Sequence, residues 1–419
     1  MSRFALFVLA TRPATHVAIF AVMVAARPAA GQSSAAPGTY ALKISGYGNI
    51  VGTRSADDPH ADAGALSEAE IELTPQYRTE SGIVLAARSA LGIAGAASEP
   101  RSSWRLSVPE ASVFAIGDFG RIEIGERAGF PQSLVGFTPS EIAFTSPGFG
   151  PESGARLDPD GRLPTGFLPA ALGARIDALS YLGYAARFYS DRSFKAIYLT
   201  PRSRSGFYAA VSYTPETNRP TGYGIAGSER VAAGTQRQPA DPGRYTDVVQ
   251  AAIVWNQRTE AIDLSIGATY SHAQGTDTAR DRRSDSFSGG VTATWHDSWT
   301  VGLSGTVDNA ARRTGVRDTP YGIVASADHV SGPWVFGGYY QHATADSQAA
   351  LPTQDIIDIG ELGLSYLVDQ NHDLFGNDVH TDAKLFASVY AYGLRSETDA
   401  LATRQRGQVF LIGARFSFY

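Results

Sequence analysis

Residues 408–419, which read QVFLIGARFSFY, indicate the fold class because they have the pattern of a strand with one apolar face. Successive side chains of a strand point to opposite faces. The residues that share the apolar face are Phe410, Ile412, Ala414, Phe416 and Phe418. Chain ends usually fray in water, and a soluble protein gains little from aromatic residues there. The pattern therefore favours a strand in a membrane wall over its alternative, the last strand of a soluble sheet.

The composition narrows the class of protein further. The 419 residues include 44 Gly, 19 Tyr and 20 Phe, and 18% of them are charged, against roughly 25% in typical soluble domains. No internal run reaches the ~18 apolar residues that a membrane helix needs. Cysteine is absent, which excludes thiol catalysis, cysteine-ligated zinc and disulfides, and a net charge of -6 argues against nucleic acid as a partner. A membrane β-barrel or a large soluble β-protein remains.

Residues 1–31 have the form of a secretory signal peptide. Arg3 and Arg12 precede an apolar run over residues 17–26, and small residues follow at 29–31. A membrane anchor is the alternative, but the run is too short to span a bilayer. We expect cleavage before Gln32, which leaves residues 32–419 as one β-barrel domain outside the cytoplasm.

The mature chain contains sixteen candidate strands, most of them near the 9–11 residues that span a membrane when tilted. Alternation is clean in the second and tenth candidates and poor in the fourth and sixth. The candidates are 40–51, 68–78, 83–93, 104–116, 121–127, 194–200, 207–213, 245–256, 262–272, 286–296, 300–308, 321–329, 334–342, 356–367, 382–392 and 408–419.

The connections between these candidates alternate in length. Those after even-numbered strands are mostly tight, with residues 368–381 as the exception, whereas those after odd-numbered strands, such as 94–103 and 128–193, are longer. Short turns on one rim and long loops on the other are typical of an outer-membrane barrel. A sheet in hydrocarbon must close to pair its backbone groups, and sixteen strands leave an aqueous lumen. The sequence therefore predicts an all-β, antiparallel transmembrane barrel of about sixteen strands.

Several segments resemble the general diffusion porins of Gram-negative outer membranes. Residues 42–48 (LKISGYG) resemble their first strand, and residues 117–125 (GDFGRIEIG) resemble the turn and fifth strand that lead into the third loop. Residues 175–181 (RIDALSY) or 195–201 (KAIYLTP) resemble the segment that leaves this loop, and residues 408–419 resemble the family's last strand.

Three features depart from the family pattern. Tyr419 follows Phe418, where the family usually ends on Phe. Glu126 stands where the fifth strand usually carries Arg, and Arg127 comes one position later. Residues 150–154 only loosely echo the acidic motif of the third loop.

The resemblance implies a water-filled outer-membrane channel that passes small hydrophilic solutes and ions by diffusion, without enzymatic activity or cofactor. It also implies a homotrimer that contacts outer-membrane lipid and lipopolysaccharide and is inserted by the barrel assembly machinery. In the family the last strand is the assembly signal, carried here by Phe410, Phe416, Phe418 and Tyr419. A substrate-specific channel is the nearest alternative. A secreted glycan-binding β-protein and an outer-membrane lipase or protease are the others.

The resemblance further implies a constriction where the third loop, about residues 128–193, folds into the lumen. The acidic candidates on this loop are Glu152, Asp158 and Asp160, which could instead be solvated charges or a divalent-ion site. An Arg facing lipid costs about 2–4 kcal/mol at the midplane, so inward is the default for arginines in strands. The basic candidates for the wall and loop are Arg78, Arg88, Arg105, Arg121, Arg127, Arg175 and Lys195. Glu123 shares a strand face with Arg121 and Arg127, and Glu72 also faces the lumen by alternation.

Aromatic and histidine side chains fall near the predicted strand ends. Trp residues belong there as interface girdles, and the candidates are Trp104, Trp255, Trp295, Trp299 and Trp334. The histidines near strand ends are His272, His296, His329 and His342, which we interpret as rim residues rather than metal ligands. Motifs of zinc proteases, serine hydrolases and phosphate-binding loops are absent from the sequence.

Overall fold

The computed structural model describes residues 37–55, 64–98, 101–127, 182–183, 193–217, 245–275, 283–309, 319–346, 354–370, 381–396 and 403–418. The predicted signal peptide, most of the predicted third loop and Tyr419 lie outside these ranges. Within them, no helix is long and apolar enough to cross a membrane.

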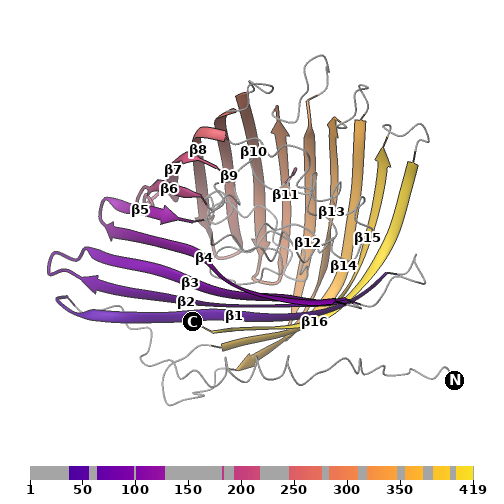
Figure 1. Cartoon of the computed structure of the whole chain (residues 1–419), viewed down its shortest axis with the longest axis horizontal. Helices are drawn as coiled ribbons and strands as arrows, with labels where there is room; N and C mark the ends of the chain where they lie inside the picture. The colour runs from indigo at the N-terminus through magenta and orange to yellow at the C-terminus, as the bar shows by residue number, and fades with distance from the viewer. Residues whose placement is uncertain are drawn as a thin grey trace.

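Sixteen antiparallel strands form one closed barrel, in which each strand pairs with its neighbours in the chain and β1 pairs with β16. Figure 1 shows this order as a colour gradient, with indigo β1 beside yellow β16 where the barrel closes. The strands are β1 Tyr40–Ser55, β2 Gly64–Arg78, β3 Val84–Ser98, β4 Arg101–Gly117, β5 Gly120–Glu126, β6 Phe194–Leu199, β7 Phe207–Glu216, β8 Tyr245–Arg258, β9 Ile262–Gly275, β10 Arg283–Trp295, β11 Trp299–Asp308, β12 Tyr321–Ser331, β13 Trp334–Asp346, β14 Gln354–Gln370, β15 Thr381–Ser396 and β16 Thr403–Phe418. The predicted fold class is confirmed.

Many strands extend further toward the long-loop rim than the sequence pattern predicts. The prediction of a long connection at residues 94–103 is wrong, because β3 and β4 stay paired as far as Ser98 and Arg101. Residues 94–98 are Ala, Gly and Ser, which have weak strand propensity and no large side chains to show alternation. Backbone pairing with β4 extends the strand where local propensity would end it.

The poor alternation of the fourth predicted strand has a structural cause. Between the pairs Ala90↔Glu110 and Gly92↔Ser107, β4 contains one more residue than β3, which is a β-bulge. Pro109 lies within the bulge and has no N–H to donate to the ladder. An inserted residue reverses the faces of the side chains beyond it, so period-two counting fails across this strand.

The two faces of the wall differ: the outer face exposes apolar side chains, whereas the inner face carries both apolar and polar ones. Phe410 and Ile412 are exposed on the outer face of β16, Ile412 at 68%, whereas Val409 and Leu411 point inward and are buried. On β11, Leu303 is exposed and Ser304 is buried. The inner face also carries buried polar residues, among them Gln250, Gln341 and Glu361.

Aromatic residues lie at both rims of the barrel. Four of the predicted girdle tryptophans lie beside tight turns, and they are Trp255, Trp295, Trp299 and Trp334. The exposed aromatics at the long-loop rim include Tyr213, Tyr270, Tyr321 and Tyr340, together with Phe194 and Phe287. Trp104 lies on β4, and its side chain is outside the described set. Aromatic rings at both rims are typical of membrane interfaces.

Candidate functional site

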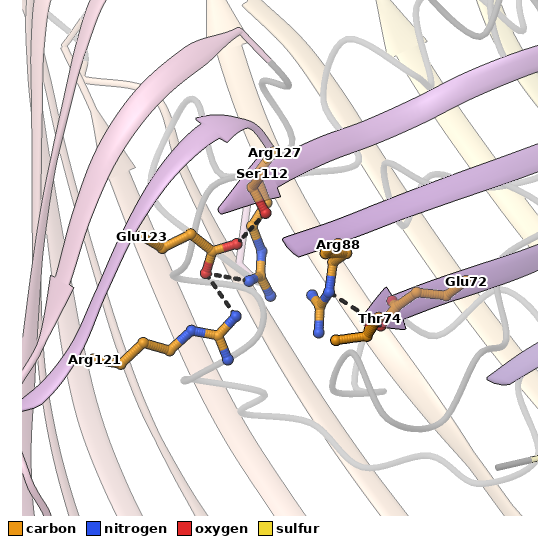
Figure 2. Close-up of polar contacts among 7 residues, drawn as sticks. All are labelled: Glu72, Thr74, Arg88, Ser112, Arg121, Glu123 and Arg127. Carbon is orange, nitrogen blue, oxygen red and sulfur yellow. Dashed lines mark hydrogen bonds and ion pairs between the residues drawn. The ribbon is translucent and has the colours of Figure 1, made fainter. Parts of the chain in front are cut away.

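Glu123 lies at the centre of a polar cluster on the inner wall of β4 and β5 (Figure 2). Its side chain is only 2% exposed. Ser112 donates a hydrogen bond to Oε1 at 2.6 Å, and Arg127 donates one to Oε2. Arg121 forms an ion pair with the same Oε2 at 2.8 Å. One carboxylate therefore holds two guanidinium groups.

The local sequence of β5 explains this arrangement. Arg121 and Glu123 are two residues apart in a strand, so their side chains share the inner face. Gly125 has a φ of 151°, and a Cβ atom there would collide with the Ala111 carbonyl and with Ser112. Only glycine fits this close approach of β5 to β4, which keeps Ser112 within reach of Glu123.

The aromatic ring of Phe114 on β4 packs against the guanidinium group of Arg121. The guanidinium carbon of Arg121 lies 4.0 Å from the centre of the Phe114 ring, which is a cation–π contact. Phe114 is the cross-strand partner of Glu123. The ring and the carboxylate together fix the Arg121 side chain on the inner wall.

A second ion pair adjoins this cluster on β2 and β3. Arg88 Nε lies 3.0 Å from Glu72 Oε1, and Thr74 donates a hydrogen bond to the same oxygen at 3.0 Å. Arg88 is the cross-strand partner of Ser112, so both ion pairs belong to one stretch of wall. Figure 2 shows the Arg88 guanidinium between Glu72 and the Glu123 group.

Charges of both signs lie close together on this stretch of wall. Three arginines (Arg88, Arg121 and Arg127) and two glutamates (Glu72 and Glu123) form direct ion pairs, and all five are buried or half-buried. Glu110 of β4 adds a third carboxylate that interacts with Arg127. Lys195 of β6 is also buried. It lies on the strand next to this cluster, since its cross-strand partner Gly125 pairs in turn with Ser112. We call Glu72, Arg88, Arg121, Glu123 and Arg127 the charged wall.

The third loop begins and ends at this wall and reaches the other side of the barrel in between. Residues 182–183 contact β11–β13, and β12 is seven strands away from β5 in a ring of sixteen. Ser304 donates a hydrogen bond to the Gly183 carbonyl, and Gln341 Nε2 donates one to the Leu182 carbonyl at 2.7 Å. Leu182 is fully buried and belongs to an apolar cluster with Val324 and other inner residues. Residues 182–183 of the loop therefore lie against the inner wall at β11–β13, seven strands away from the strand where the loop begins.

Gly322 makes this docking possible. A Cβ atom at Gly322 would collide with the backbone of Leu182, so no side chain fits between the loop and β12. We call the contact of Leu182 and Gly183 with Ser304, Gln341 and Gly322 the loop latch.

The structure brings together three of the predicted basic residues, Arg88, Arg121 and Arg127, and it places Lys195 on the neighbouring strand. Arg78 lies at the tight-turn end of β2, in the cross-strand row that leads through Val84 and Ile116 to Arg121. Arg105 lies on β4, but its side chain is outside the described set. The residues outside the described ranges are Glu152, Asp158, Asp160 and Arg175.

Sequence reasoning placed Glu72 and Glu123 on the inner face but missed the central role of Glu123 and the support from Ser112 and Phe114. It also missed the loop latch. One usable signal was Gly322, because a glycine inside a strand often marks close backbone approach. Nothing in the local sequence of Leu182 and Gly183 indicates which wall they contact.

Three solved structures are similar to this chain. A structure described under asymmetric conductivity of engineered proteins has a TM-score of 0.50 and 13% identity, covering 90% of this chain and 100% of its own. A triple mutant of the Rhodopseudomonas blastica porin has a TM-score of 0.49 and 13% identity over 90% and 100% of the two chains. Vibrio cholerae OmpT lacking loop L8 has a TM-score of 0.48 and 12% identity over 90% and 99%. At these identities the likeness concerns the fold alone.

No curated protein matches the sequence. The family model described as Gram-negative porin matches residues 18–408, which is most of the chain. The protein is therefore a member of the Gram-negative porin family, and it is an outer-membrane β-barrel channel for passive diffusion.

Proposed function

We propose that the channel is narrowed between the charged wall and the third loop, and that it selects small hydrophilic solutes and ions by charge at this point. The observation that carries the proposal is the contact of Leu182 and Gly183, two residues of the third loop, with β11–β13, far around the barrel from Arg127, where the loop begins. A solute crossing the lumen must then pass between this loop and the arginines. Fixed charges in a narrow aqueous passage raise the local concentration of counter-ions.

The acidic counterpart of the arginines in this proposal is the third loop itself. Glu152, Asp158 and Asp160 lie within its sequence, between Arg127 and Leu182. Carboxylates facing guanidinium groups across the lumen would create a transverse field that acts on charged and dipolar solutes. Arg105 and Arg175 are further candidates for the basic side.

We also propose a homotrimer that is made with a cleaved signal peptide over residues 1–31 and is inserted by the barrel assembly machinery through its last strand. Contact with lipopolysaccharide follows from a location in the outer leaflet. The support for these proposals is the membership of the Gram-negative porin family and the aromatic outer face of β16.

Planar bilayers test the proposed constriction. The refolded protein is expected to open stepwise channels, and a salt gradient gives the reversal potential and hence the ion selectivity.

Replacing Arg121 and Arg127 by Gln removes two positive charges from the charged wall and should raise the cation preference of the channel. The matched control is Arg258→Gln together with Arg202→Gln, because both arginines are exposed at the tight-turn rim. If the control pair shifts the reversal potential as much as the wall pair, the constriction lies elsewhere. Saturable block by one solute would favour a substrate-specific channel.

A further inference from the structure

One strand of the barrel carries hydroxyl groups on its inner face along its whole length. On β10 the outward side chains include Phe287, which is 54% exposed, and they alternate with small residues that point inward. Gly290 holds one of these inward positions and has no side chain. We call the hydroxyl residues at the other inward positions the hydroxyl track, and its members are Ser284, Ser286, Ser288, Thr292 and Thr294. The track runs from the long-loop rim to the tight turn before β11.

The neighbouring strands widen the track on both sides. Ser288 pairs across the sheet with Thr269 of β9 and Thr306 of β11, and its Oγ lies 2.9 Å from Thr269 Oγ1. Near the tight turn, Thr294 pairs with Thr300, and their hydroxyl oxygens are 3.1 Å apart. Each hydroxyl can donate one hydrogen bond and accept two. The inner wall over β9–β11 therefore offers many neutral groups that both donate and accept.

Two hydroxyl groups of this wall are buried and unpaired. Ser284 of the track and Ser271 of β9 are both 0% exposed, and neither Oγ has a hydrogen-bond partner among the described residues. Ser271 is the cross-strand partner of Ser286, so the two unpaired groups lie close together near the long-loop rim. Buried polar groups in proteins are normally paired, and those that are not call for water or a ligand. The track thus has hydrogen-bonding capacity that the described protein groups leave unused.

The charges around the track are negative. Asp308 of β11 pairs with Ser286 at one end, and Asp263 of β9 pairs with Thr294 at the other. Within the described parts of β9–β11, no Arg or Lys lies on the inner face, because Arg283 shares the outward face of β10 with Phe287. β10 is eight strands away from β2 in the ring of sixteen, so the track lies across the barrel from Glu72 of the charged wall (Figure 1). The lumen therefore has a charged side and a neutral side.

The loop latch meets the track halfway along its length. Ser304, which donates to the Gly183 carbonyl, is the cross-strand partner of Gly290. On the long-loop side of this point the track is buried, whereas Thr292 and Thr294 on the tight-turn side are half-buried. A solute that follows the track has to pass beside the latch.

We propose that the hydroxyl track binds neutral, hydroxyl-rich solutes, namely mono- and disaccharides, during their passage through the channel. A sugar carries many hydroxyl groups of its own, so it can replace its bound water by track hydroxyls without leaving groups unpaired. Small anions gain nothing from a wall whose only charges are carboxylates. Alternate residues of a strand lie about 6.8 Å apart, so a sugar can exchange one track hydroxyl for the next as it moves.

This proposal goes beyond the constriction, since it needs the diffusion channel but not the charged wall. Binding at the track requires that sugar occupancy saturates with concentration. Free diffusion through a wide pore would instead depend linearly on concentration.

The test uses the full-length protein in planar bilayers, where a sugar bound in the lumen reduces the ion current. Maltose is titrated on one side, and the concentration that gives half of the maximal block is measured. Polyethylene glycol of the same hydrodynamic size is the comparison solute, because its ether oxygens accept hydrogen bonds but do not donate. We expect saturable block by maltose and a current that falls only in proportion to concentration with the polymer.

Two pairs of substitutions remove track hydroxyls with little change of shape. Thr292→Val with Thr294→Val acts on the half-buried part, and Ser286→Ala with Ser288→Ala acts on the buried part. Each pair should raise the half-blocking maltose concentration about tenfold, which corresponds to roughly 1.4 kcal/mol.

The control pair is Ser365→Ala with Ser388→Ala. Both serines are buried on the inner face and unpaired among the described residues, but their cross-strand partners on β15 and β16 are Phe386 and Leu411. An equal loss of maltose block in the control pair, or unchanged block in both track pairs, would overturn the proposal. A maltose effect that is linear and equal to that of the polymer would leave only water on the track and would also overturn it. A failed constriction shows in the reversal potential of the arginine variants, whereas a failed track shows in the maltose titration.

Discussion

At the scale of single residues, Glu123 decides how much positive charge the charged wall presents to the lumen. Its carboxylate holds Arg121 and Arg127, and Ser112 and the Phe114 ring keep this group in place. Buried ion pairs contribute little net stability because desolvation offsets their attraction. The consequence of this arrangement is therefore electrostatic: one carboxylate partly cancels two guanidinium charges.

Glu123→Gln is expected to raise the ratio of anion to cation permeability. A unit charge at about 8 Å in water changes the energy of a monovalent ion by about 0.5 kcal/mol, in opposite directions for anions and cations. The permeability ratio should then rise about two- to fivefold at low salt and less at high salt, because ions screen the charge. The reversal potential across a salt gradient measures this change.

Glu260→Gln is the matched control for this change, since Glu260 is exposed in the tight turn between β8 and β9. It removes the same charge far from the charged wall and should leave the ratio unaltered. An unchanged ratio in Glu123→Gln, with the barrel folded, would exclude the charged wall from the narrowest part of the pore.

At the scale of elements, the loop latch links the third loop to β12. Gly322→Ala adds one methyl group where the backbone of Leu182 already contacts β12. We therefore expect the third loop to detach from β12 while the strand remains paired with its neighbours. The measurable result is a change in single-channel conductance with more current noise. Gly305→Ala on β11 is the control, because a Cβ there meets its nearest atom at an ordinary 3.5 Å. Conductance equal to wild type in both variants would mean that the latch does not hold the loop.

The last strand closes the barrel, and its register explains why Phe418 matters. Phe418 pairs with Gly46 of β1, and a Cβ at Gly46 would collide with the Phe418 ring. Phe418→Ala should therefore weaken the β1–β16 junction and reduce the heat-resistant assembled form, whereas deletion of Tyr419 should have little effect. Migration of unheated samples in detergent gels measures this difference. The opposite result would mean that Tyr419 is the residue required for assembly.

The strand pattern could be predicted from the sequence because each strand has to be apolar toward lipid, and this requirement shows as period-two alternation. The order and pairing of all sixteen strands then follow from tight turns and closure. The bulge at Pro109 and the extended β3–β4 pairing escaped prediction, since both depend on the neighbouring strand and not on local residues. The loop latch could not be predicted for the same reason, because the contact of Leu182 with β12 depends on the closed barrel and not on the residues around Leu182. For the charged wall, alternation identified the face of Arg121 and Glu123 but not their ion pair.

At the scale of the whole molecule, the barrel is asymmetric along its axis. The tight turns and four tryptophans, Trp255, Trp295, Trp299 and Trp334, lie at one rim, and the long connections lie at the other. In outer-membrane barrels the short turns are periplasmic and the long loops extracellular. The rim that carries the long connections should then face the outside of the cell.

The absence of cysteine allows a direct test of this orientation, because a single introduced thiol is the only one in the chain. Thr319→Cys places a thiol at the long-loop rim before β12, and Glu260→Cys places one in the tight turn before β9; both positions are exposed. We expect a polymer-linked maleimide too large for the pore to label Thr319→Cys in intact cells. Glu260→Cys should react only after the outer membrane has been permeabilised, and both variants should react fully once purified. Labelling of Glu260→Cys in intact cells would show the opposite orientation, with the tight turns on the outside of the cell.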